Sequence, residues 1–102
     1  MNEFSELIKN EFARKKIVIV GDLVADQFLR GTIARVSREA PVFILRHDET
    51  ETFPGGAANA AVNVAALGGA VSLIGLIGTD QNGAALAAKL DAQNVDLSLI
   101  HI

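Results

Sequence analysis

Two carboxylates follow the first apolar run of the sequence, at a position where a ligand-binding residue is expected. Asp22 and Asp26 come just after residues 17–20, a β-branched run typical of a central parallel strand that is buried on both faces. Ligands of open parallel sheets bind at the carboxyl ends of the strands, where a carboxylate can accept hydrogen bonds from hydroxyl groups. A structural alternative, favoured by spacing alone, is that Asp22 caps a turn and Asp26 is only solvated.

Two glycines and two amides form a second group of candidate residues. Gly55 and Gly56 precede a run of small residues at 57–67, which we expect to form a helix ended by glycine. Glycine lets a backbone approach a ligand and a helix N-terminus attracts anions, although a plain turn explains the pair equally well. Asn59, in the first turn, either faces the ligand or satisfies nearby backbone groups, and Asn63 is expected to be structural.

A third glycine-rich stretch resembles a phosphate loop only superficially. Gly75, Gly78 and Gly83 flank Asp80, but a strand-to-helix turn with Asp80 as the helix N-cap explains every one of these residues. The sequence contains neither the Gly-x-Gly-x-x-Gly pattern of dinucleotide binders nor the Gly-Lys-Ser/Thr of a P-loop. A Rossmann-type cofactor site is therefore disfavoured.

The elements that must position these residues alternate along the chain. Apolar spacing predicts a short helix at 4–12, a strand at 17–20, two to four short strands in the charged stretch 27–54, a buried helix at 57–67, a strand at 71–77 and a helix at 81–93. Strands that alternate with helices indicate an α/β fold with a parallel sheet and right-handed crossovers.

Composition limits the classes of function. The 102 residues carry a net charge of −3 and no cysteine, and the two histidines, His47 and His101, lie far apart in sequence. Disulfides, thiolate metal sites and a zinc site are therefore not expected, and no basic patch predicts a nucleic-acid partner. No apolar run is long enough to cross a membrane and no signal peptide is recognisable, so we expect a cytoplasmic protein.

Together these motifs resemble the ribokinase-type (PfkB) carbohydrate kinases. The resemblance covers about residues 16–95 and rests on Gly55-Gly56 with Asn59, on the strand-turn-helix around Gly78 and Asp80, and on the position of Asp26. It implies a ribokinase-like α/β fold, in which a parallel Rossmann-like sheet carries helices on both faces and a small β lid. Residues 1–96 would form an incomplete N-terminal part of that domain, with the lid at about 28–54. The implied sugar-binding residues are Asp26, Gly55, Gly56 and Asn59.

Within the family, the segment 35–42 is similar to kinases that phosphorylate the anomeric hydroxyl of heptose 7-phosphate for ADP-heptose and lipopolysaccharide synthesis. The resemblance implies ATP and Mg²⁺ as cofactors, a sugar phosphate as substrate, and Arg35, Ser37, Glu39 and Pro41 as lid residues. Arg38 departs from the pattern, which commonly has proline there. The alternatives are another sugar or nucleoside kinase of the family, or an inactive truncated chain that acts at most as a sugar-binding or dimerisation module.

Two features indicate that the kinase is incomplete in these 102 residues. The family's Gly-Ala-Gly-Asp motif, which supplies the anion hole and the catalytic Asp, is absent from the sequence, so we assign no catalytic residue and expect no activity from this chain alone. Residues 97–102 differ from the family's continuation and can be encoded by CTGTCTCTTATACACATC, a transposase end sequence used in sequencing libraries. We expect this tail to be non-native; the alternative is a genuine third strand.

The charged stretch also predicts an assembly. Its strand from Val42 to Leu45 has four apolar residues, and a small solvated flap cannot bury both faces of such a strand. We expect one face to cover the sugar and the other to pair with the lid of a second subunit in a homodimer.

Overall fold

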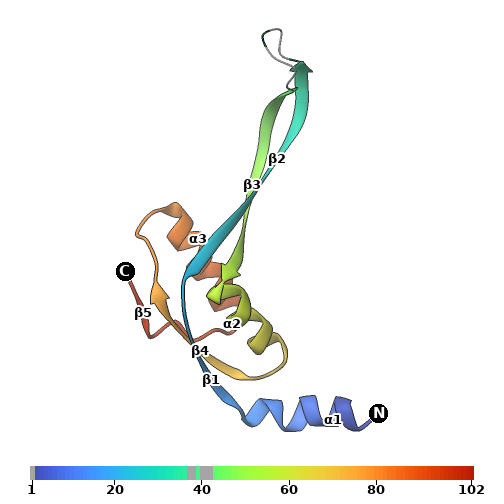
Figure 1. Ribbon diagram of the computed structural model, residues 1–102, viewed down its shortest axis with the longest axis vertical. Helices are drawn as coiled ribbons and strands as arrows, with labels where there is room; N and C mark the ends of the chain where they lie inside the picture. The colour runs from blue at the N-terminus through green and yellow to red at the C-terminus, as the bar shows by residue number, and fades with distance from the viewer. Residues whose placement is uncertain (1, 37–38, 40–42) are drawn as a thin grey trace.

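The chain forms a small parallel sheet covered by helices, from which a long hairpin projects (Figure 1). The computed structural model describes residues 2–36, 39 and 43–102. In chain order the elements are α1 (Glu3–Asn10), a 3₁₀ turn (Phe12–Arg14), β1 (Lys16–Val20), β2 (Leu23–Val36), β3 (Phe43–Gly56), α2 (Ala57–Ala66), β4 (Ala70–Leu76), α3 (Gln81–Ala92) and β5 (Ile100–His101).

The sheet has the strand order β1-β4-β5, and every pairing in it is parallel. β1 pairs with β4 from Lys16 opposite Ala70 to Val20 opposite Ile74. The chain returns to the start of the next strand through α2 and then through α3, as a parallel sheet requires. The predicted α/β fold with a parallel sheet and helices is therefore confirmed.

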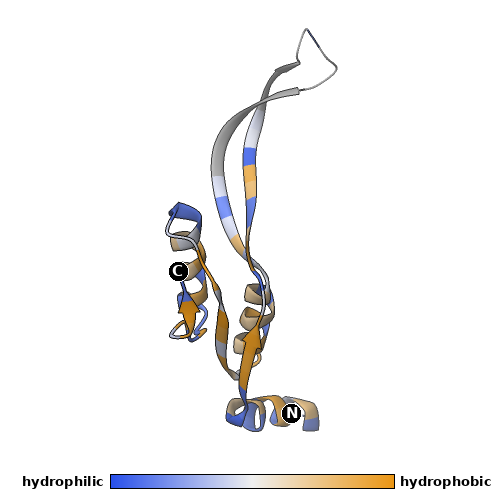
Figure 2. Ribbon diagram, turned by 60° about the vertical axis from the view of Figure 1, so that its left-hand side comes forward, coloured by the Kyte–Doolittle hydropathy of each residue, from blue (hydrophilic) through white to orange (hydrophobic). Residues whose placement is uncertain are grey.

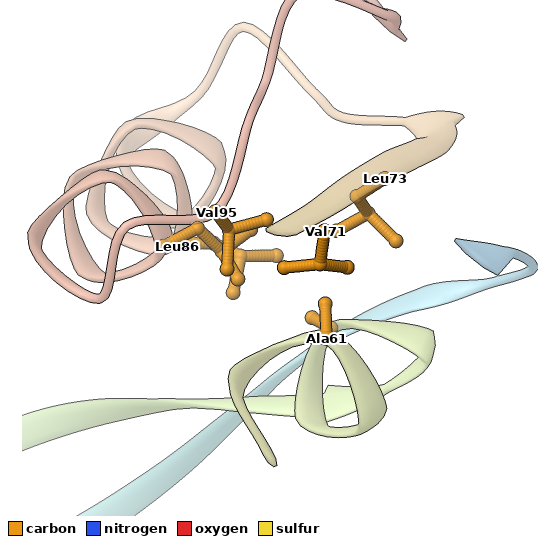
Figure 3. Close-up of a cluster of buried hydrophobic side chains, with 7 residues drawn as sticks. Ala61, Val71, Leu73, Leu86 and Val95 are labelled. Atoms are coloured by element: carbon orange, nitrogen blue, oxygen red, sulfur yellow. The ribbon is translucent and has the colours of Figure 1, made fainter. Parts of the chain in front are cut away.

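The hydrophobic core lies on one face of β4. Val71 and Leu73, two residues apart and so on the same face, contact a cluster that includes Ala61 of α2 and Leu86 of α3 (Figure 3). Ala58, Leu90 and Val95 complete the buried set. Both α2 and α3 therefore pack on the same side of the sheet.

The opposite face of the sheet is apolar and open. Val18 and Val20 of β1 are 59% and 72% exposed, and Leu76 of β4 is 73% exposed. The expectation that residues 17–20 form a central strand buried on both faces is wrong for this chain. β1 is an edge strand, and none of the helices that the structure describes covers its second face.

The helix α2 also differs from its expected environment. Its sequence is apolar almost all round, yet only Ala58 and Ala61 are buried. The remaining faces of the helix are half-buried or exposed because the sheet and the hairpin base contact it on one side. Small residues at the contact allow the close approach of helix and sheet.

The hairpin is longer and more continuous than the sequence suggested, and its register shifts between Arg30 and Gly31 and between Ile33 and Arg35. Instead of two to four short strands, β2 and β3 are two strands of 14 residues each, paired antiparallel from Leu23 opposite Gly56 to Val36 opposite Phe43. Pairing therefore extends beyond both ends of the expected segment 28–54. The hairpin leaves the sheet in both views, and its base mixes hydrophilic and hydrophobic residues, whereas β1 and β4 are largely hydrophobic (Figures 1 and 2).

The ends of the helices follow the expected capping chemistry. The Asp80 side chain accepts a hydrogen bond of 2.9 Å from the Gly83 N–H at the start of α3, which confirms Asp80 as an N-cap.

Among the described residues, no helix has the length and apolar character needed to cross a membrane.

The C-terminal tail adds a short strand to the sheet. Ile100 and His101 pair with Gly75 and Leu76 of β4, and Ile77 N–H donates to the His101 carbonyl at 2.8 Å. A third strand is what the alternative interpretation of residues 97–102 expects. The non-native origin of these residues stays a prediction.

Candidate functional site

The carboxyl ends of β1 and β4 enclose an open hollow of about 440 Å³. Its lining comprises Val20, Gly21, Asp22, Leu23, Ile74, Gly75 and Leu76. Gly21 N–H donates to the Ile74 carbonyl at 3.3 Å, and a Cβ on Gly75 would lie 3.0 Å from the Gly21 carbonyl oxygen. Glycine at position 75 therefore lets the strand ends and the start of the hairpin approach each other. The hollow lies at the edge where open parallel sheets bind ligands.

The Asp26 carboxylate lies over the backbone of Gly55. Asp26 is in β2 opposite Phe53, and Gly55 is in β3 opposite Val24, so these four residues share one face of the hairpin base. A Cβ on Gly55 would lie 3.0 Å from Asp26 Cγ and 3.2 Å from Val24 Cβ. Gly55 is buried and Asp26 is exposed. The missing side chain of Gly55 therefore leaves room for a carboxylate that remains open to solvent.

Gly56 joins the hairpin directly to α2. Its φ of +60° is in the left-handed region that favours glycine, and a Cβ there would lie 2.6 Å from the Asp22 carbonyl oxygen. That carbonyl accepts a hydrogen bond of 2.8 Å from Ala57 N–H. Gly55 and Gly56 are thus the last residues of a strand rather than a separate turn, and Asp22 satisfies a helix donor through its backbone.

The N-terminus of α2 lies at the surface, since Gly56 and Asn59 are both exposed. No side chain caps this helix, and its first turn carries no acidic residue. The remaining first-turn N–H groups give this end partial positive character. The helix starts two residues after Gly55, over which the Asp26 carboxylate lies. A hydroxyl-rich or anionic molecule placed here would meet an acceptor from β2 and donors from α2.

The structure joins some of the candidate residues and not others. Asp26 meets Gly55 within the hairpin base, and the Asp22 backbone meets Gly56 and Ala57 where the hairpin joins α2. Asn59 is the third residue of α2 and is exposed, as is Asn63 one turn later. Among the described hydrogen bonds none links Asn59 to Asp26, so the geometry leaves both proposed roles of Asn59 open.

The lid residues are only partly described. Arg35 is in β2 opposite Ile44, and Glu39 is exposed near the tip of the hairpin. Ser37 and Pro41 lie outside the described residues, as does Val42. The roles of all four lid residues stay predictions.

Two amides near the site were missed by sequence reasoning. Gln27, next to Asp26, donates a hydrogen bond from Nε2 to Oδ1 of Asn82 in the first turn of α3. The two residues are 55 positions apart, and nothing in their local sequence signals a contact. The turn before α3 is structural, as expected, because a Cβ on Gly83 would lie 2.8 Å from the Gly78 carbonyl carbon.

The chain is similar to known proteins in sequence. The sequence profile of the pfkB family carbohydrate kinase matches residues 14–102. The chain is 41% identical over 92 residues to the Bifunctional protein HldE of Psychromonas ingrahamii, covering 90% of this chain and 19% of the relative.

The chain is also similar to solved structures of kinases. The chain is similar to aminoimidazole riboside kinase from Salmonella enterica, complexed with aminoimidazole riboside and an ATP analog, at 26% identity and a TM-score of 0.62, covering 86% of this chain and 25% of that one. It is also similar to Arabidopsis thaliana ribokinase complexed with ribose and ATP, at 28% identity and a TM-score of 0.62, covering 85% and 27%. The chain thus spans about a fifth of the curated relative and about a quarter of the two solved structures.

Proposed function

Because the chain belongs to the pfkB family of carbohydrate kinases, we propose that it is the sugar-binding and lid portion of an ATP-dependent kinase for heptose 7-phosphate. In this proposal the protein transfers phosphate from ATP to the anomeric hydroxyl of the sugar, in the cytoplasmic synthesis of ADP-heptose for lipopolysaccharide.

One observation carries the assignment of a sugar site. The Asp26 carboxylate lies over Gly55, two residues before the first residue of α2, a helix whose N-terminus has no side-chain cap. A carboxylate accepts hydrogen bonds from hydroxyl groups, and uncapped helix N–H groups donate to oxygen atoms. The arrangement therefore suits a polyhydroxylated ligand, with Asp26 as the acceptor and Asn59 as the neighbouring amide in α2.

The choice of heptose 7-phosphate rests on two supports. The segment 35–42 resembles the lid of kinases for this sugar, and the curated relative at 41% identity is named Bifunctional protein HldE. In the proposal, Arg35, Ser37, Glu39 and Pro41 close over the sugar phosphate. The lid also pairs with that of a second subunit to form a homodimer.

The described residues do not form a site for the nucleotide or its cation. No group of three His, Cys, Asp or Glu among the side chains that the structure describes is arranged to hold a metal ion. The sequence has no P-loop, and the family's Gly-Ala-Gly-Asp motif does not occur in it. We therefore propose that ATP and Mg²⁺ bind to parts of the kinase outside these residues, and we derive no step of the transfer from them.

The test uses the full-length protein that contains this segment, with ATP, magnesium and heptose 7-phosphate, and ADP formation as the readout. We expect turnover with this sugar phosphate to exceed turnover with ribose, fructose or nucleosides. Asp26→Ala and Asn59→Ala should each lower the sugar kcat/KM roughly ten- to a hundredfold, since a hydrogen bond to a charged group is worth about 1.5–3 kcal/mol. The KM for ATP should not change.

A matched control is available on the same helix. Asn63 is also an exposed asparagine of α2, one turn further from the hairpin base, and Asn63→Ala should leave the sugar kcat/KM unchanged. An equal sugar kcat/KM in the Asp26→Ala variant and the parent would contradict the proposed sugar site.

A second candidate is a kinase for another sugar or a nucleoside. It is favoured by the similarity to structures complexed with ribose and with aminoimidazole riboside. Preferred turnover of one of these compounds over heptose 7-phosphate in the same substrate panel would select it.

A further inference from the structure

One stripe of α3 holds both strands of the hairpin base. Asn82 and Lys89 are seven residues apart, two helical turns, and therefore lie on the same side of the helix. Asn82 accepts the hydrogen bond from Gln27 in β2, and Lys89 Nζ lies 5.6 Å from the centre of the Phe53 ring in β3. The first contact is a directed hydrogen bond and the second is of the cation–π type.

These two anchored residues are the immediate neighbours of Asp26. Gln27 follows Asp26 in β2, and Phe53 is the residue directly opposite Asp26 in β3. The Phe53 ring also contacts Phe28 edge to face, with the ring centroids 5.1 Å apart. The carboxylate that lies over Gly55 is therefore flanked along its strand and across the hairpin by residues that α3 holds in place.

The ion pair further along the hairpin does not have this effect. Arg30 and Glu51 form an ion pair of 3.2 Å, but both residues belong to the hairpin itself. Such a pair joins β2 to β3 without fixing either strand to the body of the protein. A two-stranded ribbon is only marginally stable by itself, so the orientation of its base depends on contacts with the helices.

We propose that Gln27 and Asn82, together with Lys89 over Phe53, are positioning residues that hold the Asp26 carboxylate in its sugar-binding place. The inference rests on the proposed function, because it takes Asp26 to contact the sugar. Asn82 and Gln27 act through Asp26 and do not touch the substrate. A carboxylate held in place before the sugar arrives loses less conformational freedom on binding, which lowers the KM for the sugar.

The test measures the KM values for sugar and for ATP in the full-length protein. Gln27→Ala and Asn82→Ala should each raise the sugar KM about two- to tenfold, the range set by the net worth of one neutral hydrogen bond. The double variant should raise the sugar KM no further than either single variant does. The ATP KM should not change, whereas a merely structural weakening of the fold would affect both substrates.

Two further variants make the test specific. The exchange Gln27→Asn with Asn82→Gln keeps two amides and their combined length, and it should restore the sugar KM to within about twofold of the parent, a smaller change than one lost hydrogen bond produces. Gln81→Ala removes an exposed polar side chain next to Asn82 and should have no effect on the sugar KM.

The Asp26→Ala background separates the possible outcomes. If Gln27 acts through Asp26, adding Gln27→Ala to the Asp26→Ala variant should not raise the sugar KM further. An equal rise of the sugar KM in both backgrounds, or no rise in the parent, would overturn the positioning role while the sugar site stands. If Asp26→Ala itself leaves the sugar KM unchanged, the proposed sugar site fails and the positioning role fails with it.

Discussion

The substitution Gly55→Ala tests the geometry of the candidate site with a single methyl group. Gly55 does not have a positive φ, so alanine meets no backbone strain there. Its Cβ would instead lie 3.0 Å from Asp26 Cγ and 3.2 Å from Val24 Cβ, and closer still to a carboxylate oxygen. The carboxylate, at the end of a short side chain, must therefore move away from its place over the backbone.

The expected effect follows from the loss of that position. If Asp26 can no longer accept the hydrogen bond from the sugar, about 1.5–3 kcal/mol of binding is lost, which lowers the sugar kcat/KM roughly ten- to a hundredfold. The crowding itself should cost about 1–3 kcal/mol of folding stability. The assay is steady-state turnover of the full-length protein with varied sugar and saturating ATP, alongside thermal unfolding.

The control for this variant is Gly68→Ala at the other end of α2. Gly68 has a φ of +94°, and a Cβ placed on it would have no neighbouring atom within 4 Å, so alanine there is strained without touching a neighbour. The cost should be about 1–2 kcal/mol of stability, with no change in the sugar KM. Combining Gly55→Ala with Asp26→Ala should add no further loss of sugar kcat/KM. An undiminished sugar kcat/KM in a folded Gly55→Ala variant would refute the reasoning.

Three more predictions follow from other parts of the chain. Hydrogen bonds from the Ser98 backbone N–H, the Ser98 hydroxyl and the Ser72 hydroxyl lower the pKa of Asp96, so its contribution to stability is complete above the ordinary carboxyl pKa of about 3.9 and is lost as the pH falls through the lower folded value. Urea unfolding should accordingly show Asp96→Asn to be less stable than the parent at pH 7, with the difference shrinking below about pH 3.9; a constant difference would contradict this linkage. The double variant Val42→Asp with Ile44→Asp should convert a lid-paired dimer of the full-length protein into monomers and raise the sugar KM, and sedimentation of the parent as a monomer would exclude lid pairing. The 102-residue chain by itself should form no ADP from ATP, magnesium and heptose 7-phosphate above a no-protein blank, and turnover would show that the catalytic group is present in it.

The local chemistry of the chain made several elements predictable. Asp80 followed three residues later by Gly83, and the small residues after Gly56, indicated the starts of two helices, because capping and helix propensity act over a few neighbouring positions. The β-branched run of β1 indicated a strand for the same reason. The order of these elements was enough to predict a parallel α/β fold.

Burial was less predictable because it depends on neighbours that lie far away in the sequence. The apolar run of β1 suggested a strand covered on both sides, but the sheet order leaves Val18 and Val20 exposed at one edge. A continuous apolar run indicates that a strand can be buried, but it does not indicate which elements cover the strand. The charged stretch likewise concealed the long pairing of β2 with β3, because apolar and polar residues do not alternate regularly along it.

The sequence by itself supplied the candidate sugar-binding residues: a carboxylate after the first strand, two glycines and an amide at the start of a helix. It also indicated that the carboxylate follows the first strand of a parallel sheet, and that the glycines precede a helix. Only the tertiary structure decided that the Asp26 carboxylate lies over Gly55, and that Gln27 meets Asn82 from 55 residues away. The reason is physical: residue type sets the chemistry of a side chain, whereas its neighbours are set by the packing of the hairpin against α3, which no local pattern encodes.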